Sequence, residues 1–485
     1  MIKSLFSFGD TPLLDNTLPQ QSEYKWANAL RTFEAGGHTV LISPSNGGWA
    51  AFDGFERRIL DIRDSLPRDD TSEFLYRKGL CSKNSHILFK NKNIIDDKLY
   101  FFELAVTTCC NLRCRYCFAN ASSEGLYIDK EKAAAFIDRI AEYIADERVA
   151  CPVIVEFTGG EPLLNFPIIR YTVEYAKKTY NNLNLCFCLQ TNLTLLTDKM
   201  IEFFRAYKIG IGISLDGFKA IQDKQRPFLD GGSSYKTVES KIFELNKKYP
   251  ENPGGVIAVI TDDNVDLMPE IALLAKLFGF RDIVLRPISK LGRGDNFDGG
   301  DIFMEKYVTG LFKILNSVIT PFYEQTGEFF NERSISLTFK HLLRPERPFM
   351  CERTPCGAGR NICVVNPDGN VYACNQSVDE KLRLGNVLTD SFSDMTKSNV
   401  ASMYSNRTID KIEACSNCAV STFCNSPCAY GAYKKYGDIL GKSPECALMK
   451  SRFVKALTGL LRNEFNLSVV TKLAELKTNL EWDYI

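Results

Sequence analysis

Three cysteines in the first half of the chain have the residue type and the spacing of an iron–sulfur ligand set. Cys110, Cys114 and Cys117 form the pattern C-x3-C-x2-C, directly after the apolar run 101–106 that predicts a buried strand. Three thiolates on one loop can hold three irons of a [4Fe–4S] cluster and leave the fourth iron with an open coordination position. A structural zinc site is the alternative, but zinc prefers four ligands in paired C-x2-C units, which this triplet does not offer. The triplet therefore predicts a cluster that can bind a small molecule.

A second region rich in cysteine begins near Phe349 and reaches about residue 450. It contains eight thiols that could bind metal: Cys351, Cys356, Cys374, Cys415, Cys418, Cys424, Cys428 and Cys446. Eight thiolates suffice for two fully ligated [4Fe–4S] clusters. A pair of zinc sites is the alternative, since Cys415 and Cys418 form a C-x2-C unit.

Composition supports metal chemistry in a reducing compartment. The chain has 485 residues, 45% of them hydrophobic, with 59 basic and 59 acidic residues. This balance gives no global attraction to nucleic acid or membrane, and neither a signal peptide nor a spanning segment is evident, so we expect a cytoplasmic protein. Seventeen cysteines in such a chain indicate metal rather than disulfides, and only three histidines argue against His-based catalysis.

Between about residues 98 and 300, strand and helix patterns alternate, which favours a parallel sheet. The expected strands are Phe102–Thr107, Pro152–Phe157, Leu183–Thr191, Gly210–Leu215, Val256–Thr261 and Asp282–Ile288. The expected helices are Asp129–Ala145, Pro167–Tyr180, Thr197–Lys208, Tyr235–Lys248 and Met268–Gly279. Six such units predict an α/β fold with a partial (β/α)6 barrel like that of a TIM barrel, in which ligands bind at the carboxyl ends of the strands.

The remaining segments predict four further units. With the barrel at residues 96–300, we expect a small domain at 1–95 and a helical linker at 301–348. We also expect a cysteine-rich domain at 349–450 and a helical tail at 451–485. In the first domain we expect strands at Thr39–Pro44, Trp49–Asp53 and Ser85–Lys90 and helices at Phe55–Leu66 and Thr71–Leu80. A hairpin followed by helices and a strand predicts a winged-helix-like unit.

Polar motifs follow the second, third and fourth barrel strands, where a ligand would bind. Thr158-Gly-Gly-Glu-Pro162 ends the second strand, and its two glycines would let the backbone approach a ligand. Gln190-Thr-Asn192 ends the third strand and Ser214-Leu-Asp-Gly217 ends the fourth. No residue is assigned as acid or base; Asp216 and Tyr372 are candidates by position alone, and Asp216 is better explained as a brace of its turn.

With these motifs in place, residues 98–450 resemble the radical SAM superfamily. The resemblance implies that S-adenosylmethionine chelates the open iron and that one electron breaks its S–C5′ bond. It further implies that Gly159, Gly160 and Glu161 bind the methionine amino group, that Ser214 binds the carboxylate, and that a polar rim completes the site. The rim residues are Thr191 and Asn192. Arg226 could clamp the cofactor carboxylate through its planar fork, or it could be an ordinary surface arginine. Tyr116 could pack near the adenine of the cofactor, or it could only shield the cluster from water.

The second cysteine region resembles the SPASM domain, an extension that holds auxiliary clusters. The family's interleaved pattern implies one cluster on Cys351, Cys356, Cys374 and Cys428. It implies a second on Cys415, Cys418, Cys424 and Cys446, giving three [4Fe–4S] clusters in all. Cys363 could replace Cys351 or Cys356. We expect Cys151, Cys186 and Cys188 to be buried small apolar residues, and the family spacing selects Cys110 over Cys109.

Residues 1–95 resemble the peptide-recognition element of radical SAM peptide maturases, with a simple packing extension as the alternative. We therefore expect oxidative modification of a ribosomally synthesised peptide or protein, such as a thioether or a side-chain crosslink, with flavodoxin or ferredoxin as electron donor. Formylglycine formation in a sulfatase is a second possibility, but those enzymes carry an Asp base where this chain has Asn375. A small-molecule dehydrogenase, or a redox partner without catalysis, is the third.

Overall fold

A ten-stranded sheet organises the protein. The computed structural model describes residues 24–27, 30–44, 47–53, 66, 70–83, 98–252, 254–297, 299–344 and 347–476. The strand order is β12-β11-β10-β9-β8-β7-β6-β13-β14-β15. Its strands are β6 Phe101–Thr107, β7 Val153–Gly159, β8 Leu185–Thr191, β9 Gly210–Ser214, β10 Val256–Ile260, β11 Asp282–Pro287, β12 Asn331–Glu332, β13 Ile362–Val365, β14 Asn370–Tyr372 and β15 Arg383–Asn386.

All six predicted strands form, and they lie side by side in chain order with parallel neighbours. This confirms the α/β fold with a mostly parallel sheet, while closure into a partial barrel stays a prediction. The sequence did not predict that β13 pairs in parallel with β6, or that β14 and β15 continue the sheet antiparallel. The cysteine-rich region therefore extends the sheet.

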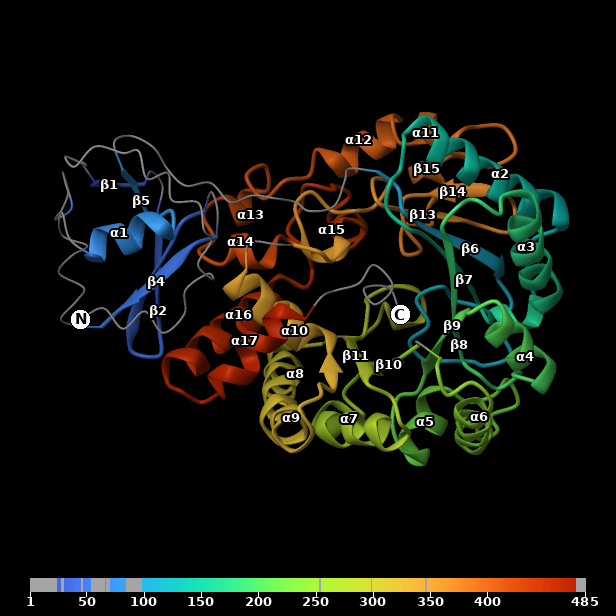
Figure 1. The fold of residues 1–485 in the computed structure, drawn as a ribbon, viewed down its shortest axis with the longest axis horizontal. Helices are drawn as coiled ribbons and strands as arrows, with labels where there is room; N and C mark the ends of the chain where they lie inside the picture. The colour runs from blue at the N-terminus through green and yellow to red at the C-terminus, as the bar shows by residue number, and fades with distance from the viewer. Residues whose placement is uncertain are drawn as a thin grey trace.

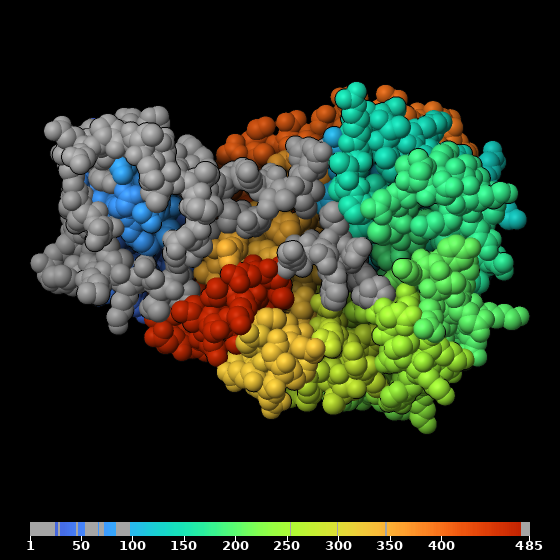
Figure 2. Space-filling model, in the orientation of Figure 1, coloured from blue at the N-terminus to red at the C-terminus, as the bar shows by residue number. Residues whose placement is uncertain are grey.

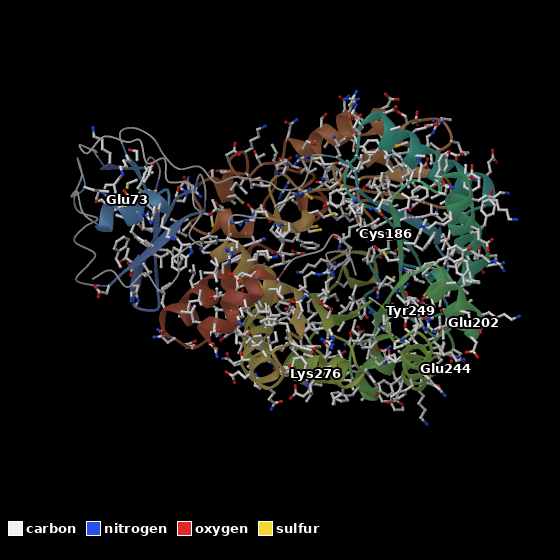
Figure 3. The ribbon with its side chains drawn as sticks, viewed as in Figure 1. Glu73, Cys186, Glu202, Glu244, Tyr249 and Lys276 are labelled. Atoms are coloured by element: carbon white, nitrogen blue, oxygen red, sulfur yellow. The ribbon has the colours of Figure 1, made fainter. Side chains whose placement is uncertain are left out.

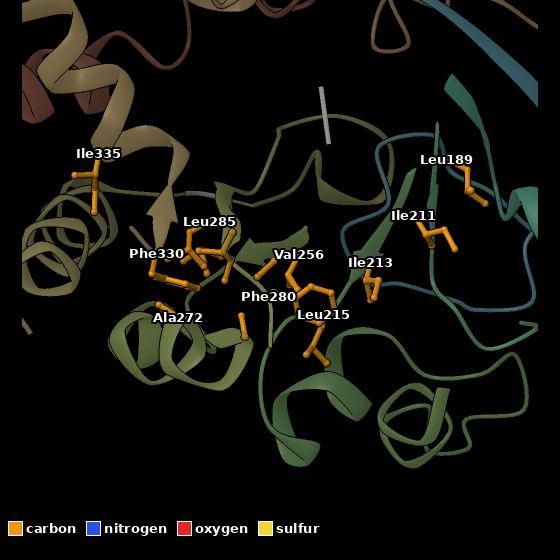
Figure 4. Close-up of a cluster of buried hydrophobic side chains, with 14 of the residues drawn as sticks. Leu189, Ile211, Ile213, Leu215, Val256, Ala272, Phe280, Leu285, Phe330 and Ile335 are labelled. Atoms are coloured by element: carbon orange, nitrogen blue, oxygen red, sulfur yellow. The ribbon is translucent and has the colours of Figure 1, made fainter. Parts of the chain in front are cut away.

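Helices cover the outer side of this sheet (Figure 1). They are α2 Lys130–Asp146, α3 Phe166–Thr179, α4 Asp198–Ala206, α5 Lys219–Gln225, α6 Tyr235–Lys248 and α7 Met268–Leu277. Side-chain caps fix the starts of two of them, because Asp129 accepts from the Lys132 N–H and Thr197 from the Met200 N–H. Apolar strand residues such as Ile213 and Val256 pack beneath the helices (Figure 4). Glu202 and Glu244 lie on these outer helices, whereas Cys186 lies toward the centre (Figure 3).

The opposite face of the sheet is different in character. Phe102, Leu104 and Val106 of β6 belong to the helix-facing core, so Phe101 and Glu103 must point the other way. The parallel register places Glu103 beside Glu156 of β7, and Glu156 beside Cys188 of β8. We call this side the inner face.

The C-terminal half supplies helices that pack around this framework. The predicted helix 302–322 forms as α8 Asp301–Ile314, a π-helical turn Leu315–Ile319 and α9 Thr320–Thr326. The later helices are α10 Arg333–Leu343, α11 Phe392–Met395, α12 Asn399–Ser405, α13 Glu413–Ser416, α14 Ser421–Cys424, α15 Ala429–Tyr436, α16 Cys446–Leu461 and α17 Leu467–Glu475. In the space-filling view, the C-terminal helices lie between the N-terminal unit and α8–α9 (Figure 2).

The N-terminal unit has its own small core. Strands β2 Arg31–Ala35, β3 His38–Ile42 and β4 Trp49–Phe52 form an antiparallel sheet, β1 Tyr24–Trp26 pairs with β5 Cys81–Lys83, and α1 spans Asp70–Arg77. The predicted hairpin and the helix 71–80 are present. The predicted helix 55–66 falls almost wholly, and the strand 85–90 wholly, outside the described residues. The winged-helix assignment stays a prediction.

Long-range hydrogen bonds from Arg31 and Trp49 attach this unit to the rest of the chain. The Trp49 Nε1–H donates to the Leu342 carbonyl at 2.9 Å, and Arg31 Nη1 donates to the Cys418 carbonyl at 2.6 Å. Across the described part of the chain, every helix is too short or too polar to cross a membrane.

Candidate active site and iron–sulfur centres

The loop of Cys110, Cys114 and Cys117 leaves the carboxyl end of β6 and is held by backbone bonds on both sides. The Cys110 N–H donates to the Ser122 carbonyl at 2.7 Å, and the Arg115 N–H donates to the Gln225 carbonyl at 3.0 Å. Arg293, which sequence reasoning missed, donates from Nε to the Cys114 carbonyl at 2.7 Å. The three thiols share one small cluster of packed side chains. The loop is thus fixed before any ligand arrives.

The chemistry of this donor set fits an iron cluster. Burial raises the pKa of Cys110 to about 12 and that of Cys114 to about 11, and the charges of neighbouring thiolates add to both shifts. Three thiols that repel one another as thiolates in apolar surroundings need bound cations to ionise together, and irons supply that charge. Among the described residues, no three His, Cys, Asp or Glu side chains are arranged to hold a single metal ion.

The two glycines of the 158–162 turn serve a purpose that the sequence did not predict. A Cβ on Gly159 would lie 2.1 Å from the Thr107 carbonyl oxygen, and one on Gly160 would lie 2.1 Å from the Cys109 carbonyl oxygen. The Gly160 N–H donates to the Thr107 carbonyl and the Glu161 N–H to the Cys109 carbonyl, both at 2.9 Å. The glycines therefore make room for the backbone of β6 and the cysteine loop, and their predicted contact with the cofactor stays a prediction.

We expect Gly160→Ala to disturb the cysteine loop, because the new Cβ meets backbone atoms that cannot rotate away. Overpacking of this kind costs about 1–3 kcal/mol. The test is the iron content and the thermal midpoint of the purified protein, with Gly300→Ala as control, since a Cβ there meets nothing within 4 Å. An unchanged midpoint and iron content in Gly160→Ala would contradict this assignment.

The Glu161 carboxylate ties the 158–162 turn to the end of β8. Its Oε1 accepts from the Thr191 hydroxyl at 2.6 Å and its Oε2 accepts from the Asn192 N–H at 2.8 Å. Burial raises the pKa of Glu161 to about 7, and these hydrogen bonds oppose the rise. Asn192 Nδ2 in turn donates to the side-chain Oδ1 of Asn111, on the cysteine loop, at 3.0 Å. Glu161, Thr191 and Asn192 thus brace one another, and a contact with a cofactor stays a prediction.

Asp216 is the centre of a second brace. Its carboxylate accepts from the Tyr116 hydroxyl, pairs with Arg226 Nε at 2.9 Å and accepts from the Val259 N–H at 2.9 Å. The Arg226 guanidinium lies 5.3 Å from the centre of the Tyr116 ring and favours the ionised form of Cys114, opposing the rise in its pKa. Arg226 is buried and not a surface arginine. Tyr116 and Arg226 therefore both pack around Asp216, behind the cysteine loop. A contact of either residue with the cofactor stays a prediction.

Ser214, at the end of β9, is buried and accepts a hydrogen bond from Gln190 Nε2 at 3.0 Å. This contact aligns the ends of β8 and β9. Its predicted role toward the cofactor carboxylate stays a prediction.

The eight C-terminal thiols fall into two groups. Burial raises the pKa of Cys351 and of Cys428, and the charges of Cys356 and Cys374 raise both further, which indicates that these four thiols are neighbours. The second group, Cys415, Cys418, Cys424 and Cys446, is linked in the same way. The sequence predicts one cluster on each of these sets, and the binding of clusters by them stays a prediction. Cys363 lies on β13 in the main core. Burial raises the pKa of its thiol well above the usual range, and the charge of Glu103 raises it further.

A contact that sequence reasoning missed connects this region to the sheet. Asn375 Nδ2, next to Cys374, donates to Glu103 Oε1 on the inner face at 2.7 Å. A lone Glu in each of the apolar runs 101–106 and 152–157 was the available signal for Glu103 and Glu156.

Comparisons with known proteins agree with this arrangement. Residues 104–278 match the family described as Radical SAM superfamily, and residues 356–419 match SPASM, the iron-sulfur cluster-binding domain. An uncharacterized protein of Methanocaldococcus jannaschii is 35% identical over 190 residues, which are 39% of this chain and 63% of that protein, so the match spans less than two thirds of it. A cysteine-type anaerobic sulfatase-maturating enzyme of Clostridium perfringens strain 13 is 27% identical over 73% of this chain and 94% of its own length.

A solved structure shares the fold over most of the chain. It is SuiB of Streptococcus suis bound to its precursor peptide SuiA, with a TM-score of 0.52 and 13% identity, covering 87% of this chain and 99% of SuiB.

Proposed function

Because the chain is a radical SAM enzyme with a C-terminal SPASM domain and belongs among the maturases, we propose that it oxidatively modifies a ribosomally synthesised peptide or protein. The product would be a thioether or a side-chain crosslink. Bound at a reduced cluster on Cys110, Cys114 and Cys117, S-adenosylmethionine supplies a 5′-deoxyadenosyl radical. We assign flavodoxin or ferredoxin as the electron donor and the cytoplasm as the location.

The observation that carries this proposal is the hydrogen bond from Asn375 to Glu103. It places the Cys374 segment, part of the first auxiliary group, against the inner face of the same sheet whose strand ends hold the cofactor motifs. A substrate on that face would therefore lie between the radical site and an electron acceptor. Oxidative products need both, because removal of one hydrogen atom leaves a radical that must still lose an electron.

The N-terminal unit supports a peptide or protein substrate. It is a small β-rich domain with its own core, attached next to the SPASM region through Arg31 and Trp49. SuiB, with a precursor peptide bound, has a similar fold over most of this chain. We propose that residues 1–95 hold the leader of the substrate, and that eight SPASM cysteines hold two auxiliary clusters.

Formylglycine formation is the second candidate, favoured by the relationship to sulfatase-maturating enzymes. Asn375 weighs against it, because an amide cannot accept a proton at neutral pH as the Asp of those enzymes does. In this structure Asn375 is instead a donor to Glu103.

The experiment is co-expression with short peptides encoded beside the gene, under anaerobic conditions. We expect one peptide to lose two hydrogen atoms by mass spectrometry, only with the active enzyme. A sulfatase peptide converted to formylglycine, with no encoded peptide changed, would contradict the proposal and favour the second candidate.

A further inference from the structure

Glu103 occupies a place where a carboxyl group is costly. It is the only charged residue of β6, is 3% exposed, and lies between strands β7 and β13. Moving a carboxylate into such surroundings without full compensation costs several kcal/mol. A fold that needed only packing would place an apolar side chain here. A chemical role for Glu103 would explain why a carboxyl group occupies this position.

Hydrogen bonding satisfies only half of this carboxyl group. Oε1 accepts from Asn375 Nδ2 at 2.7 Å. Oε2 is buried and has no hydrogen-bond partner within the described residues. An unused buried carboxyl oxygen in the centre of the inner face is available to a proton or to a ligand.

Glu156 lies next to Glu103 in register and forms a carboxyl pair with it. Burial raises the pKa of Glu103 well above its usual range, and the charge of Glu156 raises it further, while Arg286 of β11 opposes both. Burial also raises the pKa of Glu156 to about 8, against Arg286 and Arg333 of α10. Two carboxyls so close titrate as a unit and hold protons at neutral pH that separate surface carboxyls would release.

The other titratable groups that face the pair are thiols. Cys188 on β8 lies beside Glu156 in register, and burial and the charge of Glu103 both raise the pKa of Cys374. Cys363 on β13 is also near Glu103, but it lies beside Phe102 on the helix-facing side of the sheet. Arg286 is the shared cation, because it acts on both carboxyls and on Cys351 of the first auxiliary group. The groups that act on the pair thus come from β8, β11, α10 and the Cys374 segment.

The inner face is open to solvent around the pair. Glu156, Arg286 and Asn375 are each partly exposed, although they lie on the side of the sheet that the outer helices do not cover. A substrate side chain could therefore reach Glu156 directly. Glu103 would then lie behind Glu156, as seen from the substrate, and would act through it.

We propose that the Glu103–Glu156 pair is the base that accepts the proton released by the substrate during its oxidation. This rests on the proposed function. In a thioether-forming reaction the substrate loses a C–H and an S–H bond and gains a C–S bond. The carbon-bound hydrogen leaves as an atom to the 5′-deoxyadenosyl radical, the thiol proton goes to the carboxyl pair, and one electron goes to an oxidised iron–sulfur cluster on the SPASM cysteines.

Asn375 gives this base its place relative to the electron acceptor. It joins Glu103 through one hydrogen bond and Cys374 through one peptide bond. The proton and the electron would then leave the substrate toward the same side. Where a sulfatase maturase has Asp after this cysteine, this chain has an amide that positions a carboxyl group supplied by β6.

The test compares Glu103→Gln and Glu156→Gln with Asp282→Asn in the holoenzyme. Asp282 is a fitting control, because burial raises its pKa to about 6 on the same sheet, yet it lies at the amino end of β11. We expect the Gln variants to form 5′-deoxyadenosine within about twofold of wild type, while the modified peptide falls by roughly 10²–10⁴-fold, the range for loss of general base catalysis. Asp282→Asn should match wild type in both.

The pH profile separates a base from a packing residue. In the wild type, product formation should rise with pH through about 8, because the pair can accept a proton only after it has lost one. Glu156→Gln should shift the pH of this rising limb of the profile. Equal losses of 5′-deoxyadenosine and product in the Gln variants, or an unmoved limb, would overturn the inference.

A second readout does not depend on any substrate. Infrared difference spectra of the resting holoenzyme should show a protonated carboxyl band that persists at pH 7 and weakens in each Gln variant. If no peptide is modified by wild type, the proposed function fails and this band still tests the carboxyl pair. Its absence from wild type would overturn the inference by itself.

Discussion

Replacing Cys110, Cys114 and Cys117 together with alanine should abolish cleavage of S-adenosylmethionine while both auxiliary groups still bind iron. The three thiols are the donors on the loop after β6, and the other two groups lie on separate segments. We expect the rate of 5′-deoxyadenosine formation to fall at least roughly a thousandfold, about 4 kcal/mol in the activation barrier.

Iron content and electron paramagnetic resonance would accompany this measurement. The control is Cys109→Ala, because Cys109 is an adjacent buried thiol outside the C-x3-C-x2-C pattern. Cleavage that survives in the triple variant, or is lost with Cys109→Ala alone, would show that the donor set has been assigned wrongly.

Replacing Arg452 with methionine should destabilise the protein by about 3–5 kcal/mol, the usual cost of leaving one partner of a buried ion pair alone. Arg452 on α16 donates from Nη2 to Glu352 Oε2 at 2.6 Å, and its side chain is 3% exposed. The pair joins the helix that begins at Cys446 to the segment that follows Cys351. His341 lies 3.8 Å from the same carboxylate, but burial lowers its pKa, so it cannot replace the lost charge.

Denaturant unfolding of the holoenzyme measures this effect. The double variant Arg452→Met with Glu352→Gln should recover much of the loss, because it removes both charges. The matched control is Arg170→Met, whose ion pair with Glu174 is exposed and should contribute at most about 1 kcal/mol. Equal effects of the Arg452 and Arg170 substitutions would contradict the buried-pair interpretation.

Much of the fold was predictable because its signals are local. Each of the six parallel strands that were predicted is a short apolar run between turn residues, and Asp129 and Thr197 are capping residues at the helix starts. The grouping of the C-terminal cysteines followed from resemblance to a family, since spacing alone did not separate two iron clusters from a pair of zinc sites.

The rest depends on contacts between distant segments. The pairing of β13 with β6 joins residues separated by more than 250 positions, and it decides that Asn375 meets Glu103. The glycines 159 and 160 illustrate the same limit, because a glycine pair indicates a close approach without saying which backbone approaches. Arg226 resembled a surface residue until Asp216 and Tyr116 were placed around it.

We propose that a radical formed at the Cys110–Cys117 loop takes a hydrogen atom from a peptide on the inner face. The most direct measurement uses a peptide substrate deuterated at its carbon positions, with anaerobically reduced enzyme and S-adenosylmethionine. We expect deuterium in 5′-deoxyadenosine in proportion to the peptide that is modified. Modified peptide with no deuterium transfer, or 5′-deoxyadenosine formed at the same rate with and without any peptide, would contradict it.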